Sequence, residues 1–374
     1  MEKFLKNLYK KFLNFDRNYY FRDVKTWFGV EELKLNKKIL KEFYENYQRV
    51  SFLEFLGNVK DIIYSKNVFD FITKNAVDDW DLWYYLRFLE KEKIIKVRRT
   101  SKVSLLKKEI RRVIPRPQTE KEIKRKIEKR LKIKIKEKEP VINMFKKFQD
   151  FVVKARWDQM PISMGSAIFV VKKILENLAL NKRFLFIGDD DFVSVILTLT
   201  NPNIECLVID IDEQLLECIN LLALKFNLKI ETRKVDIRKQ KALREKFVGF
   251  LCHPVCTEEG VKEFVKYGKK QLDKDGGVVF LEVGDEAIGN RFLFLQDFFA
   301  KENLIIEEVI ANKIYYPWIS LHKEDKIIAR RLFSMIDKKI VTKNPRLGAS
   351  LYIFEYLPFK VSRVKFKKSI YSYL

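Results

Sequence analysis

Short apolar runs alternate with amphipathic segments through the second half of the chain. The runs Phe184–Ile187 and Cys206–Ile211 have strand length, and the segment between them, Phe192–Thr200, has helical spacing. Further strands are predicted at residues 229–235, 247–253 and 277–283, and further helices at 163–178, 214–227 and 258–272. Strands that alternate with helices are typical of a parallel sheet covered on both faces. We therefore predict an α/β fold with a Rossmann-like, doubly wound sheet.

The first hundred residues have a helical pattern instead. Helices are predicted near the N-terminus and at residues 38–47, 68–73 and 78–90. The last of these is followed by the apolar run IIKV and the basic run RRTSK. A helix followed by a short basic hairpin is the outline of a winged helix, so we predict a winged-helix-like domain over residues 1–100. Its aromatic residues, Trp80, Trp83, Tyr84 and Tyr85, are expected in a core or a dimer interface rather than against bases.

The rest of the chain is predicted to form a connector and one large domain. Residues 101–140 are basic, contain two prolines in VIPRP, and include a helix that begins with the capping box Thr119 and Glu122. We interpret this stretch as a solvated helical linker. Residues 141–374 are assigned to the Rossmann-like domain. In its C-terminal part, residues 305–319 are expected to form a lid, LGASLYIFEYLP a closing strand, and the basic end of the chain an arm.

Composition adds a strong positive charge. Lys and Arg number 75 against 51 Asp and Glu, a formal net charge of +24. This excess favours polyanionic partners such as nucleic acid, but Lys- and Glu-rich composition is also typical of heat-adapted proteins. No signal peptide and no membrane span are predicted, and the four cysteines suggest reduced thiols in the cytoplasm. Cys252, His253 and Cys256 lack a second cysteine pair, so no metal site is predicted.

Acidic residues follow the first two predicted strands of the sheet. Asp189, Asp190 and Asp191 follow Gly188 after the first strand, and Asp210 and Asp212 end the second. The carboxyl ends of neighbouring parallel strands form one crevice, where ligands bind. One glycine with three carboxylates would repel phosphate.

This chemistry indicates a nucleoside without phosphates, such as S-adenosylmethionine. Asp210 is placed to accept hydrogen bonds from two ribose hydroxyls, and Asp236, after the third strand, from the adenine amino group. The surplus acid of the first strand is expected to face a cation. The alternative for the Asp run is a solvated turn that caps the next helix.

The motifs GDDDFVSVILTLT and VIDIDE, with WDQ upstream, resemble the branched-chain polyamine synthases. These aminopropyltransferases transfer an aminopropyl group from decarboxylated S-adenosylmethionine to spermidine and release methylthioadenosine. The resemblance implies a class I methyltransferase-like domain with Asp191 as the proton acceptor. It also implies two groups of binding residues. The adenosyl group is expected at Gly188, Gln159, Asp210, Asp212 and Asp236, and the cationic amine at Asp158, Asp189, Asp190 and His253.

One departure from the family motif leaves alternatives open. Where the family has Asp-Pro-Pro after the fourth strand, this chain has Cys252-His253-Pro254-Val255, so a histidine replaces a carboxylate. A first hypothesis is aminopropyl transfer to a polyamine, in a homodimer joined through the N-terminal domain. A second is a diverged paralogue that binds an adenosyl ligand or a polyamine without turnover. A third, based on the basic connector, is a nucleic-acid-binding protein or a methyltransferase.

Overall fold

The structure, a computed structural model, describes residues 1–27, 51–65, 79–98, 102–146, 153–154, 157–239, 242–317, 327 and 347–359. The chain forms two compact units. One comprises residues 1–109 and 357–374, and the other residues 110–356. This division differs from the expected one, because most of the predicted linker belongs to the second unit.

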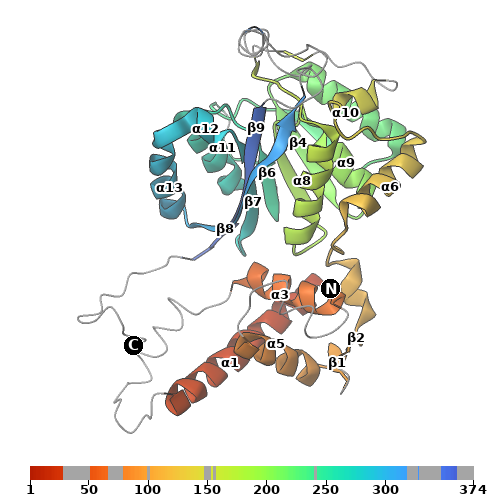
Figure 1. The fold of residues 1–374 in the computed structure, drawn as a ribbon. Coiled ribbons are helices and arrows are strands. Elements are labelled where there is room, and N and C mark those ends of the chain that lie inside the picture. Colours follow the sequence, from red (N-terminus) through yellow and green to blue (C-terminus); the bar gives the residue numbers. More distant parts are fainter. Residues whose placement is uncertain are drawn as a thin grey trace, which may run out of the picture. The chain divides into compact units, whose positions relative to one another are not determined.

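The first unit contains three described helices and a hairpin. Its elements are α1 (Glu2–Trp27), α3 (Phe52–Tyr64), α5 (Asp79–Lys91), β1 (Ile95–Val97) and β2 (Val103–Leu105), and the short helix η2 (Lys108–Arg112) begins at its boundary (Figure 1). The ring of Phe12 stacks on Tyr85 with 4.5 Å between centroids, and Tyr85 is buried, which confirms its expected place in a core. The antiparallel hairpin follows α5 as expected. The winged-helix assignment stays a prediction, since the helices expected at 38–47 and 68–73 lie outside the described residues.

The second unit is built on a seven-stranded sheet in the order β5-β4-β3-β6-β7-β9-β8. Its strands are β3 (Arg183–Ile187), β4 (Glu205–Asp210), β5 (Ile230–Lys234), β6 (Gly249–Cys252), β7 (Gly277–Val283), β8 (Leu304–Tyr316) and β9 (Leu347–Tyr356). The first five strands of the sheet are parallel, while β9 pairs antiparallel with β7 and β8 antiparallel with β9. This order is the class I methyltransferase-like arrangement, so the predicted fold class is confirmed.

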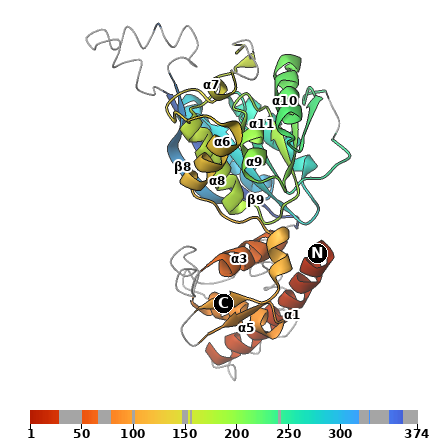
Figure 2. The same ribbon diagram turned by 90° about the vertical axis from the view of Figure 1, so that its right-hand side faces the viewer.

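Helices cover both faces of the sheet. On one face lie α8 (Met164–Asn177), α9 (Val193–Thr200) and α10 (Glu213–Phe226), and on the other α11 (Glu258–Gln271) and α13 (Phe292–Lys301), as Figures 1 and 2 show. Three shorter helices complete the unit: α7 (Ile142–Phe145), α12 (Asp285–Ile288) and η4 (Gly289–Arg291). All residues of α9 are buried, since the sheet lies on one side and further helices on the other.

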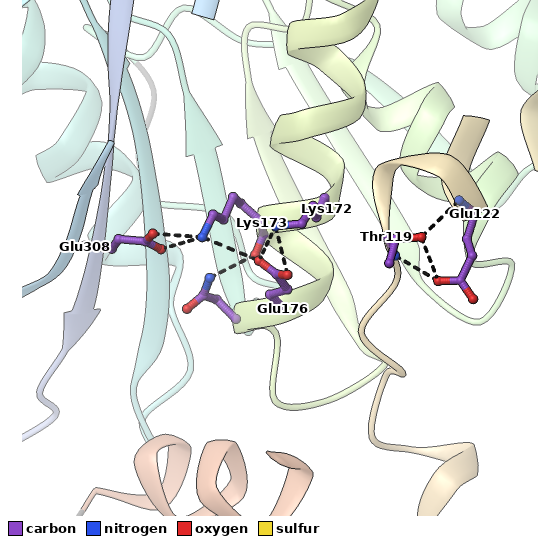
Figure 3. A network of polar contacts seen from close by, with 7 residues as sticks. Thr119, Glu122, Lys172, Lys173, Glu176 and Glu308 are labelled. Atoms are coloured by element: carbon purple, nitrogen blue, oxygen red, sulfur yellow. Dashed lines mark hydrogen bonds and ion pairs between the residues drawn. The ribbon is translucent and has the colours of Figure 1, made fainter. Parts of the chain in front are cut away.

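Helix α6 (Glu120–Leu131) packs over α9 and α8 (Figure 2). Its residues Ile123, Ile127 and Leu131 are buried, and Arg130 Nη2 donates a hydrogen bond to the carbonyl of Phe226 at 2.9 Å. The expectation of a solvated spacer is therefore wrong for this helix. The charged residues face outward, while the isoleucines at helical spacing extend the core. The capping box of Thr119 and Glu122 is present as predicted (Figure 3).

Most of the segment expected to form a lid is instead part of the edge strand β8, which ends at Tyr316. Lys173 of α8 contacts both carboxylate oxygens of Glu308 at 2.8 Å and so joins this strand to the helix (Figure 3). The closing strand predicted in LGASLYIFEYLP is confirmed as β9. The expected C-terminal arm, residues 360–374, lies outside the described residues. Among the helices that are described, none has both the length and the apolar character to cross a membrane.

Candidate functional site

The tips of β3 and β4 lie side by side, because the two strands are parallel and paired through Ile187 and Ile209. Gly188 directly follows β3 and adopts φ +78°, a conformation that favours glycine. A Cβ atom at this position would lie 3.7 Å from Oδ2 of Asp210. The structure therefore brings the two predicted acidic turns together.

Asp189 caps helix α9. Its Oδ1 accepts a hydrogen bond from the backbone N–H of Val193 at 2.8 Å, and its Oδ2 accepts one from Ser194 Oγ at 2.5 Å. Phe192 occupies the N-cap position with φ 50° and forms no side-chain cap. Asp189 therefore accepts hydrogen bonds from the backbone N–H groups at the start of α9 that have no partner within the helix. Burial raises the pKa of Asp189 well above its ordinary value. Both oxygens are used within the protein, so the capping part of the alternative considered from the sequence holds for Asp189, but the turn is buried rather than solvated here.

Asp190 and Asp191 are held by the segment that follows the WDQ motif. Asp190 Oδ2 accepts from the N–H of Met160 at 3.0 Å, and Asp191 Oδ1 accepts from the N–H of Ile162 at 2.7 Å. Asp191 is buried and Asp190 half-buried. Burial, followed by the charge of Asp191, raises the pKa of Asp190 to about 8. Two carboxylates with fixed orientations thus lie next to each other.

His253 lies between Asp191 and Tyr316. Its Nδ1 is 3.4 Å from Asp191 Oδ2, and its Nε2 is 2.7 Å from the hydroxyl of Tyr316. His253 directly follows β6, whereas Tyr316 ends β8. Burial alone would lower the pKa of His253, but the contact with Asp191 outweighs it and raises the pKa to about 10. The contact with Asp191 therefore favours the protonated imidazole, which faces the predicted proton acceptor.

Glu282 is a site residue that the sequence reasoning missed. It lies on β7, where Leu281 pairs with Cys252, so Glu282 and His253 are the next residues along two neighbouring strands. It is 0% exposed, and among the described residues neither carboxylate oxygen has a hydrogen-bond partner. Burial, followed by the charge of Asp191, raises the pKa of Glu282 to about 8. The available signal was one carboxylate within the otherwise apolar run GVVFLEV.

The second strand tip is organised by a separate network. Asp210 Oδ1 accepts from the N–H of Asp212 at 2.7 Å, and burial raises the pKa of Asp210 to about 6. Asp212 caps α10 and accepts from Lys154 Nζ at 2.5 Å and from Gln159 Nε2 at 3.0 Å. Lys154 was not predicted from the sequence. Gln159 thus orients Asp212. The other oxygen of Asp210, Oδ2, lies next to Gly188.

Two predicted residues take no part in the contacts described above. Asp236 follows β5 and is bound by Arg238, whose Nε and Nη2 lie 2.9 and 2.8 Å from its oxygens. Asp158 is exposed and adopts φ 56°. By contrast, Asp190, Asp191 and His253 each offer one donor atom within 4.8 Å of the others. The charged groups therefore concentrate at the ends of β3, β6 and β7, and we call these three residues with Glu282 the acidic cluster.

Comparison with known proteins identifies the family to which this region of the chain is similar. Residues 143–362, more than half of the chain, match the model of the branched-chain polyamine synthase A C-terminal domain. An uncharacterized protein of Methanocaldococcus jannaschii is 34% identical over 151 residues, and the N(4)-bis(aminopropyl)spermidine synthase of the same organism is 30% identical over 143 residues. These regions cover 40% and 36% of this chain but only 38% and 40% of the relatives' own lengths.

A solved structure of similar architecture is the branched-chain polyamine synthase of Thermus thermophilus, in complex with N4-aminopropylspermidine and 5'-methylthioadenosine. It is 16% identical, with a TM-score of 0.47, and the match covers 86% of this chain and 94% of that one. The family model, which spans the whole strand-tip region, is decisive: this chain belongs to the branched-chain polyamine synthase A family through its C-terminal domain.

Proposed function

We propose that the chain transfers the aminopropyl group of decarboxylated S-adenosylmethionine to an amine of a polyamine and releases methylthioadenosine. The observation that supports this most is the acidic cluster beside the tip of β4. In a protein of formal charge +24, the carboxyl groups of Asp190, Asp191 and Glu282 provide a local site for cationic substrates, because an approaching ammonium group favours their ionised forms. Family membership supports the same reaction class.

Binding of the adenosyl group would use the β4 side of the site. Asp210 accepts hydrogen bonds from the ribose hydroxyls, and Gly188 leaves room for the nucleoside to approach the backbone. Asp212 and Gln159 position this turn through their hydrogen bond. Asp236 would contact adenine only after its ion pair with Arg238 has broken. The sulfonium end of the ligand then extends toward the acidic cluster.

The transfer is a displacement at the aminopropyl carbon. The lone pair of a neutral amine forms the new C–N bond while the C–S bond breaks, and the bonding pair returns to sulfur to give the neutral thioether. The nitrogen then loses its proton to Asp191. Alignment of amine and carbon can lower the barrier by about 7 to 11 kcal/mol, so positioning is the main task of the protein. The remaining ammonium groups of the acceptor would favour the ionised forms of Asp190 and Glu282 and be bound by them.

The direct test is product analysis. Purified protein incubated with decarboxylated S-adenosylmethionine and spermidine is expected to yield methylthioadenosine and a branched polyamine, both identified by mass spectrometry. Glu308→Gln is a suitable control, because this residue lies on β8 in an ion pair with Lys173, outside the acidic cluster. If no linear polyamine yields methylthioadenosine, the proposed reaction is wrong.

A second candidate function rests on the contact between His253 and Asp191. A histidine cation already occupies the neighbourhood of the proton acceptor, and this favours a diverged member that binds its ligands without turnover. Calorimetry would then show binding of methylthioadenosine or spermidine while no product forms. Restoration of transfer by His253→Asp would support this candidate, whereas turnover by the unchanged protein would exclude it.

A further inference from the structure

Three side chains with metal-ligand chemistry converge in the acidic cluster. One donor atom of each of Asp190, Asp191 and His253 lies within 4.8 Å of the other two. Neighbouring donors around a tetrahedral ion with bonds of about 2.0 to 2.1 Å are roughly 3.4 Å apart. The observed distance between His253 Nδ1 and Asp191 Oδ2 is 3.4 Å. Carboxylate oxygen and imidazole nitrogen together suit Zn²⁺ and its neighbours in the first transition series.

A second observation comes from a different strand. Glu282 is fully buried on β7, and neither of its oxygens has a hydrogen-bond partner in the described part of the chain. The charged groups that act on it are Asp191, His253 and Asp190, which are the same three residues. An unpaired buried carboxylate is costly unless a proton or a cation accompanies it. A metal ion between these groups would supply that charge.

The surrounding hydrogen bonds also orient the donors. Tyr316 contacts Nε2 of His253 and so leaves Nδ1 directed at Asp191. The N–H groups of Met160 and Ile162 each hold one oxygen of a carboxylate. Metal-binding histidines and carboxylates usually have such outer contacts, which fix the ring and the carboxylate plane.

From this geometry we infer that Asp190, Asp191 and His253 bind one divalent transition-metal ion, whose charge also compensates the buried carboxylate of Glu282. The inference goes beyond the proposed aminopropyl transfer and differs from the expectation of no metal site. His253 is essential to it, because its Nδ1 supplies the nitrogen once the metal ion has displaced the proton from that atom. The ion and a cationic amine would use the same carboxylates, so metal and polyamine compete for the site.

The test is a metal titration of the full-length protein after chelator treatment. Addition of Co²⁺ is expected to give one equivalent of binding with the visible absorption of a nitrogen- and oxygen-ligated ion, and Zn²⁺ is expected to displace it. His253→Gln should weaken Co²⁺ binding more than tenfold and change the spectrum, and Glu282→Gln should weaken it as well. Glu308→Gln, on β8, should change neither. Circular dichroism verifies that each variant is folded.

Two results would overturn the inference: no stoichiometric Co²⁺ binding, or an affinity that His253→Gln leaves unchanged in a folded protein. Spermidine should raise the apparent Kd for Co²⁺ if the two share the carboxylates, and an unchanged Kd would contradict the shared site. None of these measurements needs turnover. A protein that binds Co²⁺ but makes no methylthioadenosine would therefore contradict only the proposed transfer. A protein that makes methylthioadenosine but does not bind Co²⁺ would contradict only the metal site.

Discussion

Nδ1 of His253 lies 3.4 Å from Oδ2 of Asp191, although the two residues follow different strands and are far apart in sequence. On its other side the imidazole contacts the Tyr316 hydroxyl at 2.7 Å. This arrangement puts an imidazole whose protonated form is favoured next to the proposed proton acceptor. The contact between His253 and Asp191 bears on all three possibilities for the site: aminopropyl transfer, ligand binding without reaction, and metal binding.

Replacement of the proposed proton acceptor tests its role. Asp191→Asn is expected to lower kcat by about 10² to 10⁴, because the amide cannot take the proton as the C–N bond forms. The affinity for methylthioadenosine should stay within a few fold, since we propose that Asp210 holds the nucleoside. Single-turnover kinetics and calorimetry separate the two effects. Wild-type kcat in this variant would assign proton transfer to another group.

Nucleoside binding is expected to depend on pH through Asp210. Burial raises its pKa to about 6, so the carboxylate is ionised above this pH and protonated below it. The ionised form is the better acceptor for ribose hydroxyls. The affinity for methylthioadenosine should therefore fall, by up to about tenfold per pH unit, as the pH drops below 6. Calorimetry from pH 5 to 8 measures this, and Asp210→Asn should bind weakly at every pH. A flat wild-type profile would contradict the assignment.

The buried carboxylate of Glu282 should make the metal-free protein less stable. In Glu282→Gln a neutral amide of nearly equal size replaces it, and the free energy of unfolding at pH 8 is expected to rise by about 1 to 3 kcal/mol. Chemical denaturation in the presence of a chelator measures the change. Glu308→Gln, which loses an ion pair with Lys173, should show no such gain. A less stable Glu282→Gln protein would mean that this carboxylate is compensated in the fold.

Asp189 is expected to act through the fold rather than through the substrate. Asp189→Ala removes the acceptor for Val193 and Ser194 at the start of α9, and such caps contribute about 0.5 to 2 kcal/mol. Thermal unfolding should show this loss while the KM for the amine stays unchanged. A large rise in KM with unchanged stability would instead show that Asp189 binds the amine.

Tight packing between β6 and β7 predicts a strong effect at Gly249. A Cβ atom there would lie 2.6 Å from the carbonyl oxygen of Val278 and 2.9 Å from the ring of Phe184. Gly249→Ala is expected to reduce the free energy of unfolding by about 1 to 3 kcal/mol. Gly57→Ala is the control, because nothing lies within 4 Å of its added atom in α3. This control should stabilise its helix by up to about 1 kcal/mol.

Local patterns were sufficient for the five parallel strands of the second unit and for the helices that connect them. The apolar runs at 184–187, 206–211 and 277–283 correspond to β3, β4 and β7, because a strand buried on both faces needs a continuous apolar run. The acidic residues that follow β3 and β4 could be placed together for the same reason, since parallel strands end at one edge of the sheet. Aminopropyl transfer was suggested by these motifs through their resemblance to a family, and family membership is confirmed.

Contacts between distant segments were decided only by the tertiary structure. Sequence spacing showed the isoleucines of α6 but not that α9 would be buried beneath them. The residues from 304 to 316 form a strand because β9, more than thirty residues later, pairs with them. Likewise the meeting of His253, Tyr316 and Glu282 depends on the order of β6, β7, β9 and β8 in the sheet. The periodicity of the sequence shows which face of a helix or strand is apolar. Which other element packs against that face is decided only when the whole chain folds.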